Sequence, residues 1–183
     1  MSELTITHNG TAQTAKTSSD KKSGIKINVS PSGLQTSAHS AGDILFTKIE
    51  MPNAVRIKGG TGVIREFVMF VSGALTDDDI TLLFFDNSTA LGEPNGDPVT
   101  DVTASEYKAS GCIGMIRLDA TYSVPMADGR LYRDSDGFLA DDIYIKAQGN
   151  TTSIWVAAIN NAGTLDLTDA TSIDINFIIE YLD

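Results

Sequence analysis

The residues that could perform catalysis are few in this chain of 183 residues, and they are poorly placed for it. A nucleophilic serine, threonine or cysteine needs a base beside it, and histidine is the usual base. The two histidines, His8 and His39, both lie in a polar N-terminal stretch, away from the β-rich remainder that would form a cleft. We therefore expect no catalytic triad and no enzyme.

Carboxylates are plentiful, with 24 acidic residues that could supply a pair for glycoside hydrolysis. Most of them fall in predicted turns, at 77–79 and 134–142, where a solvated surface explains them. The segment 134–137, DSDG, resembles the centre of an EF-hand loop, but the first ligand would then be Tyr132 and the twelfth Ile143. This excludes the EF-hand. We predict no metal site, although calcium binding by the acidic loops stays open.

Three further features could bind a ligand, and each has a simpler explanation. The segment 58–62, KGGTG, lacks the spacing of a phosphate-binding loop and is typical of a glycine turn between strands. Trp155 alternates with Ala157 and could stack on a sugar, but a core or edge aromatic has the same pattern. Cys112, the one cysteine, is expected to pack as a small buried side chain. We predict no cofactor.

Charge divides the chain into two parts. The net charge is −11, yet residues 1–43 carry four lysines against three acids, which leaves −12 for residues 44–183. An acidic body of this kind repels nucleic acid and anionic membranes, so we expect neither as a partner. The first residues contain no basic and apolar leader, and no stretch has the roughly 18 apolar residues of a membrane span. We expect synthesis in the host cytoplasm.

Alternation of apolar and polar residues predicts strands along most of the body. Segment 54–85 is predicted as three strands, with Val63, Arg65, Phe67, Met69 and Val71 sharing one face of the longest. The clearest half-buried strand is 173–181, IDINFIIEY. Its apolar face has Ile173, Ile175, Phe177, Ile179 and Tyr181, and Asp174, Asn176 and Glu180 lie on the other face.

Other elements follow from the same reasoning. Segment 111–119 is predicted as a strand with Cys112 on the face of Ile116 and Leu118, and 122–126 as an edge strand. Segments 143–147 and 154–159 are predicted to form a hairpin. The one helix start is at Thr103 and Glu106, which have the spacing of a capping box.

These elements predict an all-β protein, an antiparallel β-sandwich or jelly roll with an extended N-terminal arm. We place the Ser/Thr-rich arm at residues 1–43 and the body at residues 44–183. The arm contains short alternating apolar patches suited to adding a strand to the sheet edge of a neighbouring protein. Packing of the arm on its own body is the alternative. The predicted interface residues are Leu4, Ile6, Ile25, Ile27 and Val29.

Three segments carry a resemblance to a known family: IKGGTGVIREFVMFV at 57–71, ITLLFFDNSTALGE at 80–93, and IYIKAQGNTTSIWVAAI at 143–159. Together with the terminal strand they resemble small structural proteins of tailed bacteriophages over about residues 55–183. The resemblance implies a virion protein, most plausibly a capsid decoration or cement protein on the outer shell. The resemblance implies the major capsid protein and further copies of the chain, as in a trimer, as its partners. The alternative is a receptor- or glycan-binding module of a tail fibre or baseplate, which would use loop 86–100 and Trp155.

Overall fold

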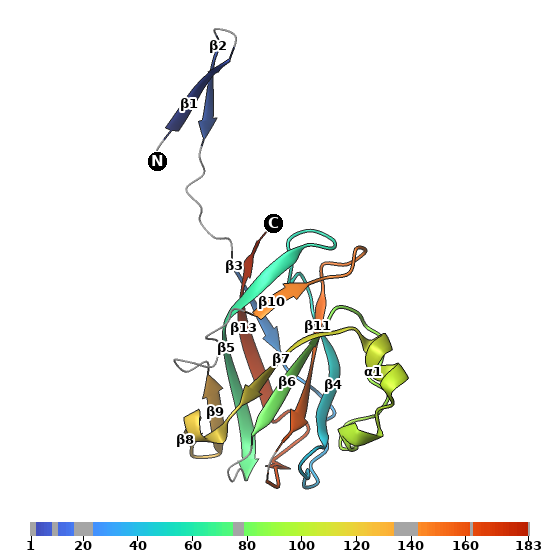
Figure 1. Cartoon of the computed structure of the whole chain (residues 1–183). Helices are drawn as coiled ribbons and strands as arrows, with labels where there is room; N and C mark the ends of the chain where they lie inside the picture. Colours follow the sequence, from blue (N-terminus) through green and yellow to red (C-terminus); the bar gives the residue numbers. More distant parts are fainter. Residues whose placement is uncertain are drawn as a thin grey trace.

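The strands pair antiparallel and assemble into two facing sheets in the computed structural model (Figure 1). The structure describes residues 3–8, 11–16, 24–74, 79–133, 143–161 and 163–182, with the backbone alone at 3–8, 11–16 and 74. Within these ranges the architecture is an antiparallel β-sandwich, as the alternation predicted.

The first sheet has β5 and β13 at its centre. Its strands follow the order β3 (Gly24–Val29), β13 (Ile173–Tyr181), β5 (Thr61–Ala74), β9 (Gly129–Arg133) and β8 (Val124–Met126), and β10 (Ile143–Lys146) and β12 (Asp166–Leu167) also pair with β5. The predicted edge position of segment 122–126 is confirmed, because β8 ends the sheet.

The second sheet contains four strands in the order β4 (Ile44–Met51), β11 (Ile154–Asn160), β6 (Ile80–Phe85) and β7 (Cys112–Leu118). Short helices lie in the connections: η1 (Val99–Asp101), α1 (Ala104–Ser110) and η2 (Ala120–Tyr122). Near the N-terminus, β1 (Glu3–His8) and β2 (Thr11–Lys16) pair only with each other, as a hairpin outside the sandwich (Figure 1).

Strand β13 joins the two sheets through its alternating side chains. Ile173, Ile175, Phe177 and Ile179 are all fully buried, as predicted. The Phe177 ring lies 6.3 Å from that of Phe67 on β5 and 5.9 Å from that of Phe84 on β6, edge to face in the second contact. Such aromatic contacts add to the free energy of burial.

A bulge in β5 corrects the predicted facing of its first half. In the pairing with β13, Ile178 lies opposite Glu66 and Ile179 opposite Ile64, so Arg65 is the extra residue of β5 at this bulge. The extra residue reverses the alternation. Ile64 therefore joins the core with Phe67, and the predicted shared face of Arg65 and Phe67 is wrong.

A second bulge, in β7, corrects the predicted position of Cys112. Gly114 pairs with Phe84 and Cys112 with Phe85, so Ile113 is the extra residue. Ile113 packs against the main core together with Ile116, whereas Cys112 packs against a smaller cluster on the other side of the second sheet.

Two strand predictions were wrong, because contacts between distant parts of the chain decide which segments pair. Residues 54–60 form turns and bends, so segment 54–85 contains two strands, β5 and β6, and not three. The predicted hairpin of 143–159 does not form, because β10 pairs with β5 in the first sheet and β11 pairs with β4 and β6 in the second. The connection between β10 and β11 crosses from one sheet to the other.

The second half of the expected arm belongs to the sandwich. Strand β3 pairs with β13, and Ile27, Val29 and Leu34 lie in the core. His39 is 1% exposed and exchanges two backbone hydrogen bonds with Leu165, so it does not lie away from the body as predicted. The structure therefore places the start of the body at or before Gly24, earlier than the predicted boundary at residue 44. A short, mostly polar stretch can join a fold when an existing sheet edge supplies its backbone partners.

Truncation of Phe177 should test the role of β13. We expect Phe177→Ala to lower the free energy of unfolding by about 3–5 kcal/mol, because it leaves a cavity between the sheets. Ile178→Ala, at the neighbouring position that is 37% exposed, is the matched control and should cost less than about 1 kcal/mol. Urea unfolding followed by fluorescence of the single tryptophan measures both, and equal losses would contradict this role.

Candidate interaction surface

The predicted interface residues separate into two groups in the structure. Leu4 and Ile6 lie on β1, whose side chains are outside the described residues, and their role stays a prediction. Ile27 and Val29 are buried in the core of their own sandwich, and Ile25 packs against it. Strand β3 does add to a sheet edge, but the edge is that of its own β13.

The outer face of the second sheet is covered by the chain itself. Residues 86–111 leave the sheet after β6, pass through η1 and α1, and return as β7. Side chains of this excursion and of the sheet enclose a second apolar cluster, formed by Ile44, Leu83, Phe85, Leu91, Ala157 and Ile159, with Val99, Val102, Cys112 and Trp155 packed against it. This face is therefore not a bare surface.

The predicted capping box starts α1 and is confirmed. The Thr103 hydroxyl accepts a hydrogen bond from the Glu106 N–H at 3.3 Å, and Glu106 Oε2 accepts one from the Thr103 N–H at 2.8 Å. Hydrogen bonds from the Thr103 side chain and backbone lower the pKa of Glu106. Gly111, at φ 66°, ends the helix in the left-handed conformation that glycine favours.

The side chain of Lys48, on β4, holds residues 86–111 against the second sheet. Its Nζ donates to the carbonyl oxygens of Ser110 at 2.6 Å and Asn87 at 3.2 Å, and it lies 4.1 Å from the centre of the Phe85 ring. Burial lowers the pKa of Lys48 to about 8, although the charge of Asp86 works in the opposite direction. One amine thus connects β4, the start of the excursion and the end of α1.

A hollow of about 350 Å³ lies beside Lys48, between β4 and the loop of residues 88–94. Its walls combine apolar Leu91 with Glu93 and Thr47. Trp155, the candidate sugar platform, is partly buried against the second cluster, so part of its side chain is occupied by internal packing. The sequence alone indicated neither the hollow beside Lys48 nor the packing of Trp155 against the second cluster.

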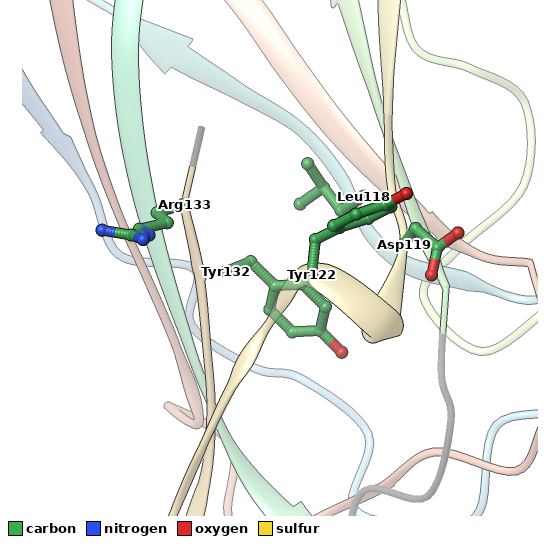
Figure 2. Close-up of a pocket in the computed structure, with 5 residues that line it drawn as sticks. All are labelled: Leu118, Asp119, Tyr122, Tyr132 and Arg133. Atoms are coloured by element: carbon green, nitrogen blue, oxygen red, sulfur yellow. The ribbon is translucent and has the colours of Figure 1, made fainter. Parts of the chain in front are cut away.

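A much smaller cavity lies between the end of β7, η2 and β9 (Figure 2). Leu118, Asp119, Tyr122, Tyr132 and Arg133 line it, and its volume is about 10 Å³. That is about the space of one water molecule. Its size leaves no room for an organic ligand.

Within the described ranges, no three His, Cys, Asp or Glu side chains lie close enough together to hold a metal ion. The acidic segments 75–78 and 134–142, which include the EF-hand-like sequence, lie outside these ranges. His39 Nε2 lies 3.0 Å from the carbonyl oxygen of Gln35, in the interior. In the same part of the chain, no helix is long and apolar enough to cross a bilayer.

The outer face of the first sheet, in contrast, carries an apolar row. Phe70 of β5 lies opposite Leu131 of β9, which lies opposite Val124 of β8, and these three share the face that points away from the core. Val68 adjoins them on β5, and Ile178 of β13 lies diagonally from Val68. Val68, Val124 and Ile178 are 42%, 42% and 37% exposed. We name Val68, Phe70, Val124, Leu131 and Ile178 the outer row.

The sequence contained a signal for this row that alternation by itself did not reveal. Residues 67–71, FVMFV, are apolar at every position, so both faces of β5 must be apolar there. One face carries Phe67, Met69 and Val71 into the core. The opposite face of β5, with Val68 and Phe70, is not fully buried by any described side chain. Exposed apolar surface of this kind is typical of binding sites.

The sequence and the fold were both compared with those of known proteins. No family model matches the sequence, and no curated protein is similar to it. Among solved structures, the VP2 subviral particle of infectious bursal disease virus is similar over 97% of this chain and 37% of that chain, with 13% identity and a TM-score of 0.39. Desmodium yellow mottle tymovirus is similar over 98% of this chain and 95% of that one, with 13% identity and a TM-score of 0.27.

These structural relatives are components of virus particles. The chain spans 37% of the VP2 chain, so most of VP2 has no counterpart here. Both TM-scores are low, and a similar fold does not by itself establish a function. The function must therefore be argued from the surfaces of the molecule.

The lowered pKa of Lys48 predicts an unusual pH dependence. Because the folded value of about 8 is below the ordinary 10.5, the unfolded chain binds this proton more tightly. The cost of burying the charge is present in full below pH 8 and is relieved as the pH rises from about 8 to 10.5. The wild type should gain roughly 1–2 kcal/mol relative to Lys48→Met across this interval, after allowance for solvent screening.

Urea unfolding at several pH values, followed by Trp155 fluorescence, measures this difference. Lys58→Met removes an exposed lysine and serves as the control, which should follow the wild type at every pH. A constant difference between the wild type and Lys48→Met would show that Lys48 is not held in the manner described.

Proposed function

We propose that this chain is a structural protein of a virus particle, specifically a capsid decoration or cement protein of a tailed bacteriophage. It binds the major capsid protein on the outer shell and acts by contact, without catalysis. The observation that carries the proposal is the outer row. One outer face of the sandwich is covered by residues 86–111, whereas the other presents the apolar outer row, bordered by Arg133, Asn176 and Glu66.

The N-terminal hairpin supports the same role. Strands β1 and β2 pair only with each other among the described strands, and an isolated two-stranded hairpin is only marginally stable in water. A third strand or an apolar surface on another protein would stabilise it. We therefore propose that the hairpin, with Leu4 and Ile6, and the outer row both contact the shell.

The charge and the sequence resemblance agree with this role. The acidic body remains soluble at high concentration, and it repels the nucleic acid inside a particle. The three segments that resemble tailed-phage structural proteins contain β6, β10, β11 and most of β5, together with the loop residues beside them. A location on the capsid surface, after synthesis in the host cytoplasm, follows from the proposal.

Substitution in the outer row should release the protein from purified shells. We expect Val68→Glu to reduce the fraction that co-sediments by about tenfold or more, because a charge would be desolvated at the contact. The fold should persist, since Arg133 lies opposite position 68. Ile57→Glu is the matched control: Ile57 is 56% exposed outside the row, and this variant should sediment like the wild type. Full retention of Val68→Glu would overturn the role of this face.

Deletion of residues 1–23 tests the hairpin separately. Gly24 begins β3, which pairs with β13, so the body should keep its unfolding transition when the deletion ends at residue 23. Retention on shells should fall. Deletion of residues 1–42 is the informative comparison, because it also removes β3, Leu34 and buried His39 and should destabilise the body. If the shorter deletion binds shells as well as the full chain, the hairpin is not a shell contact.

A further inference from the structure

Strand β3 ends the first sheet, and only one of its two edges is paired. Residues 24–29 pair with β13 in unbroken register. An antiparallel strand directs its backbone N–H and C=O groups alternately to its two sides. The groups of β3 that point away from β13 form no hydrogen bond with the described part of the chain. Such an edge is a template for another strand.

The edges at β4, β8 and β7 are protected. Along β4, the Ile44 N–H donates to the Asp97 carbonyl at 2.9 Å, the Ile44 carbonyl accepts from Gly96 at 2.7 Å, and the Thr47 N–H donates to Asn95 Oδ1 at 2.8 Å. Strand β8 has three residues and contains Pro125. Strand β7 is interrupted by its bulge. Proline, bulges, covering loops and charged side chains are the usual means of blocking an edge, and of these the described residues of β3 have only the charge of Lys26.

We propose that the free edge of β3 pairs with the β3 edge of a second copy of this chain, antiparallel across a two-fold axis. The two first sheets then become one continuous sheet. A contact of this type is isologous, so two copies satisfy each other's edges and no open edge is left. The proposal concerns the free protein and does not depend on the proposed capsid role.

The sequence of β3 is self-complementary in one register. Opposite residues of an antiparallel pair share a face, so the two-fold axis must pass through a residue. With the axis at Ile27, each Ile25 faces the partner's Val29 on the core side, and each Lys26 faces the partner's Asn28 on the outer side. No like charges meet.

The neighbouring registers are less favourable. An axis at Lys26 would place two lysines directly opposite each other, which is destabilising. An axis at Asn28 would bring Ile25 against the partner's Pro31, which has no N–H to donate. Pro31 therefore limits the pairing to residues 24–30.

The same geometry keeps the hairpins free. The hairpin precedes Gly24, and antiparallel pairing directs the two Gly24 residues to opposite ends of the joined strands. A single strand pair is smaller than the roughly 1,000 Å² of a stable interface, so the dimer is weak in solution. Copies held side by side on a surface would pair more strongly, because their effective concentration is higher.

Disulfide trapping between two distinguishable chains tests the proposal. Both chains carry Cys112→Ser, which removes the only native thiol; one carries Lys26→Cys and the other, with a mass tag, Asn28→Cys. Oxidation at high protein concentration should yield the mixed dimer well above the proportion from random pairing, because positions 26 and 28 lie directly opposite, with Cβ atoms about 5 Å apart.

A second measurement uses charge instead of thiols. Asn28→Lys places two lysine pairs in the contact and should weaken the dimer about tenfold in analytical ultracentrifugation. Asn176→Lys is the control, because Asn176 lies opposite Asn28 on β13, one strand inside the edge, and should leave the dimer unchanged. Thermal unfolding confirms that both variants fold.

Three results would overturn the proposal: random proportions of trapped dimers, a monomer at all concentrations, or a trimer as the associated species. Trapping of Gln13→Cys with Lys26→Cys would also overturn it, because position 13 lies on β2 and the edge would then belong to the hairpin.

Discussion

The structure depends on the burial of β13 between β3 and β5. Its alternating side chains fill the space between the sheets, and Phe177 contacts an aromatic ring in each of them. Strand β13 thereby holds the first strand of the body, since among the described strands β3 pairs with β13 alone. Residues far apart in sequence must meet before this core exists, which makes the sandwich a fold of long-range contacts.

The bulges in β5 and β7 adjust the sheets to this core. In β5, the extra residue Arg65 lies outside the core alternation, and its Nε donates to Glu180 Oε2 at 2.5 Å. In β7, the extra residue brings Ile113 toward the main core and directs Cys112 to the opposite side. Each bulge allows a strand with apolar residues in two phases to bury both sets. Without them, one set would face solvent or the wrong cluster.

The two outer faces of the sandwich differ, and this difference carries the functional argument. Residues 86–111 cover the second sheet and are held by the amine of Lys48. On the first sheet, no described segment covers the outer row on β5, β9 and β8 in this way, and the row is apolar. A protein that presents one apolar face, an open strand edge and a separate hairpin has three surfaces suited to other proteins.

The sequence alone determined several of the strands and the start of α1, because alternation and the capping box depend on neighbours a few residues away. It identified 173–181 as a half-buried strand and Thr103 with Glu106 as a cap, and both are confirmed. Only the tertiary structure decided the pairing. Segments 143–147 and 154–159 look like a hairpin in sequence, yet they enter different sheets, and the polar stretch before residue 44 joins the body because β13 offers it an edge. The bulges belong to the same level, since the facing of a side chain is set by the strand beside it. The apolar run at 67–71 is visible in the sequence, but only the tertiary structure decides which of its side chains another segment covers.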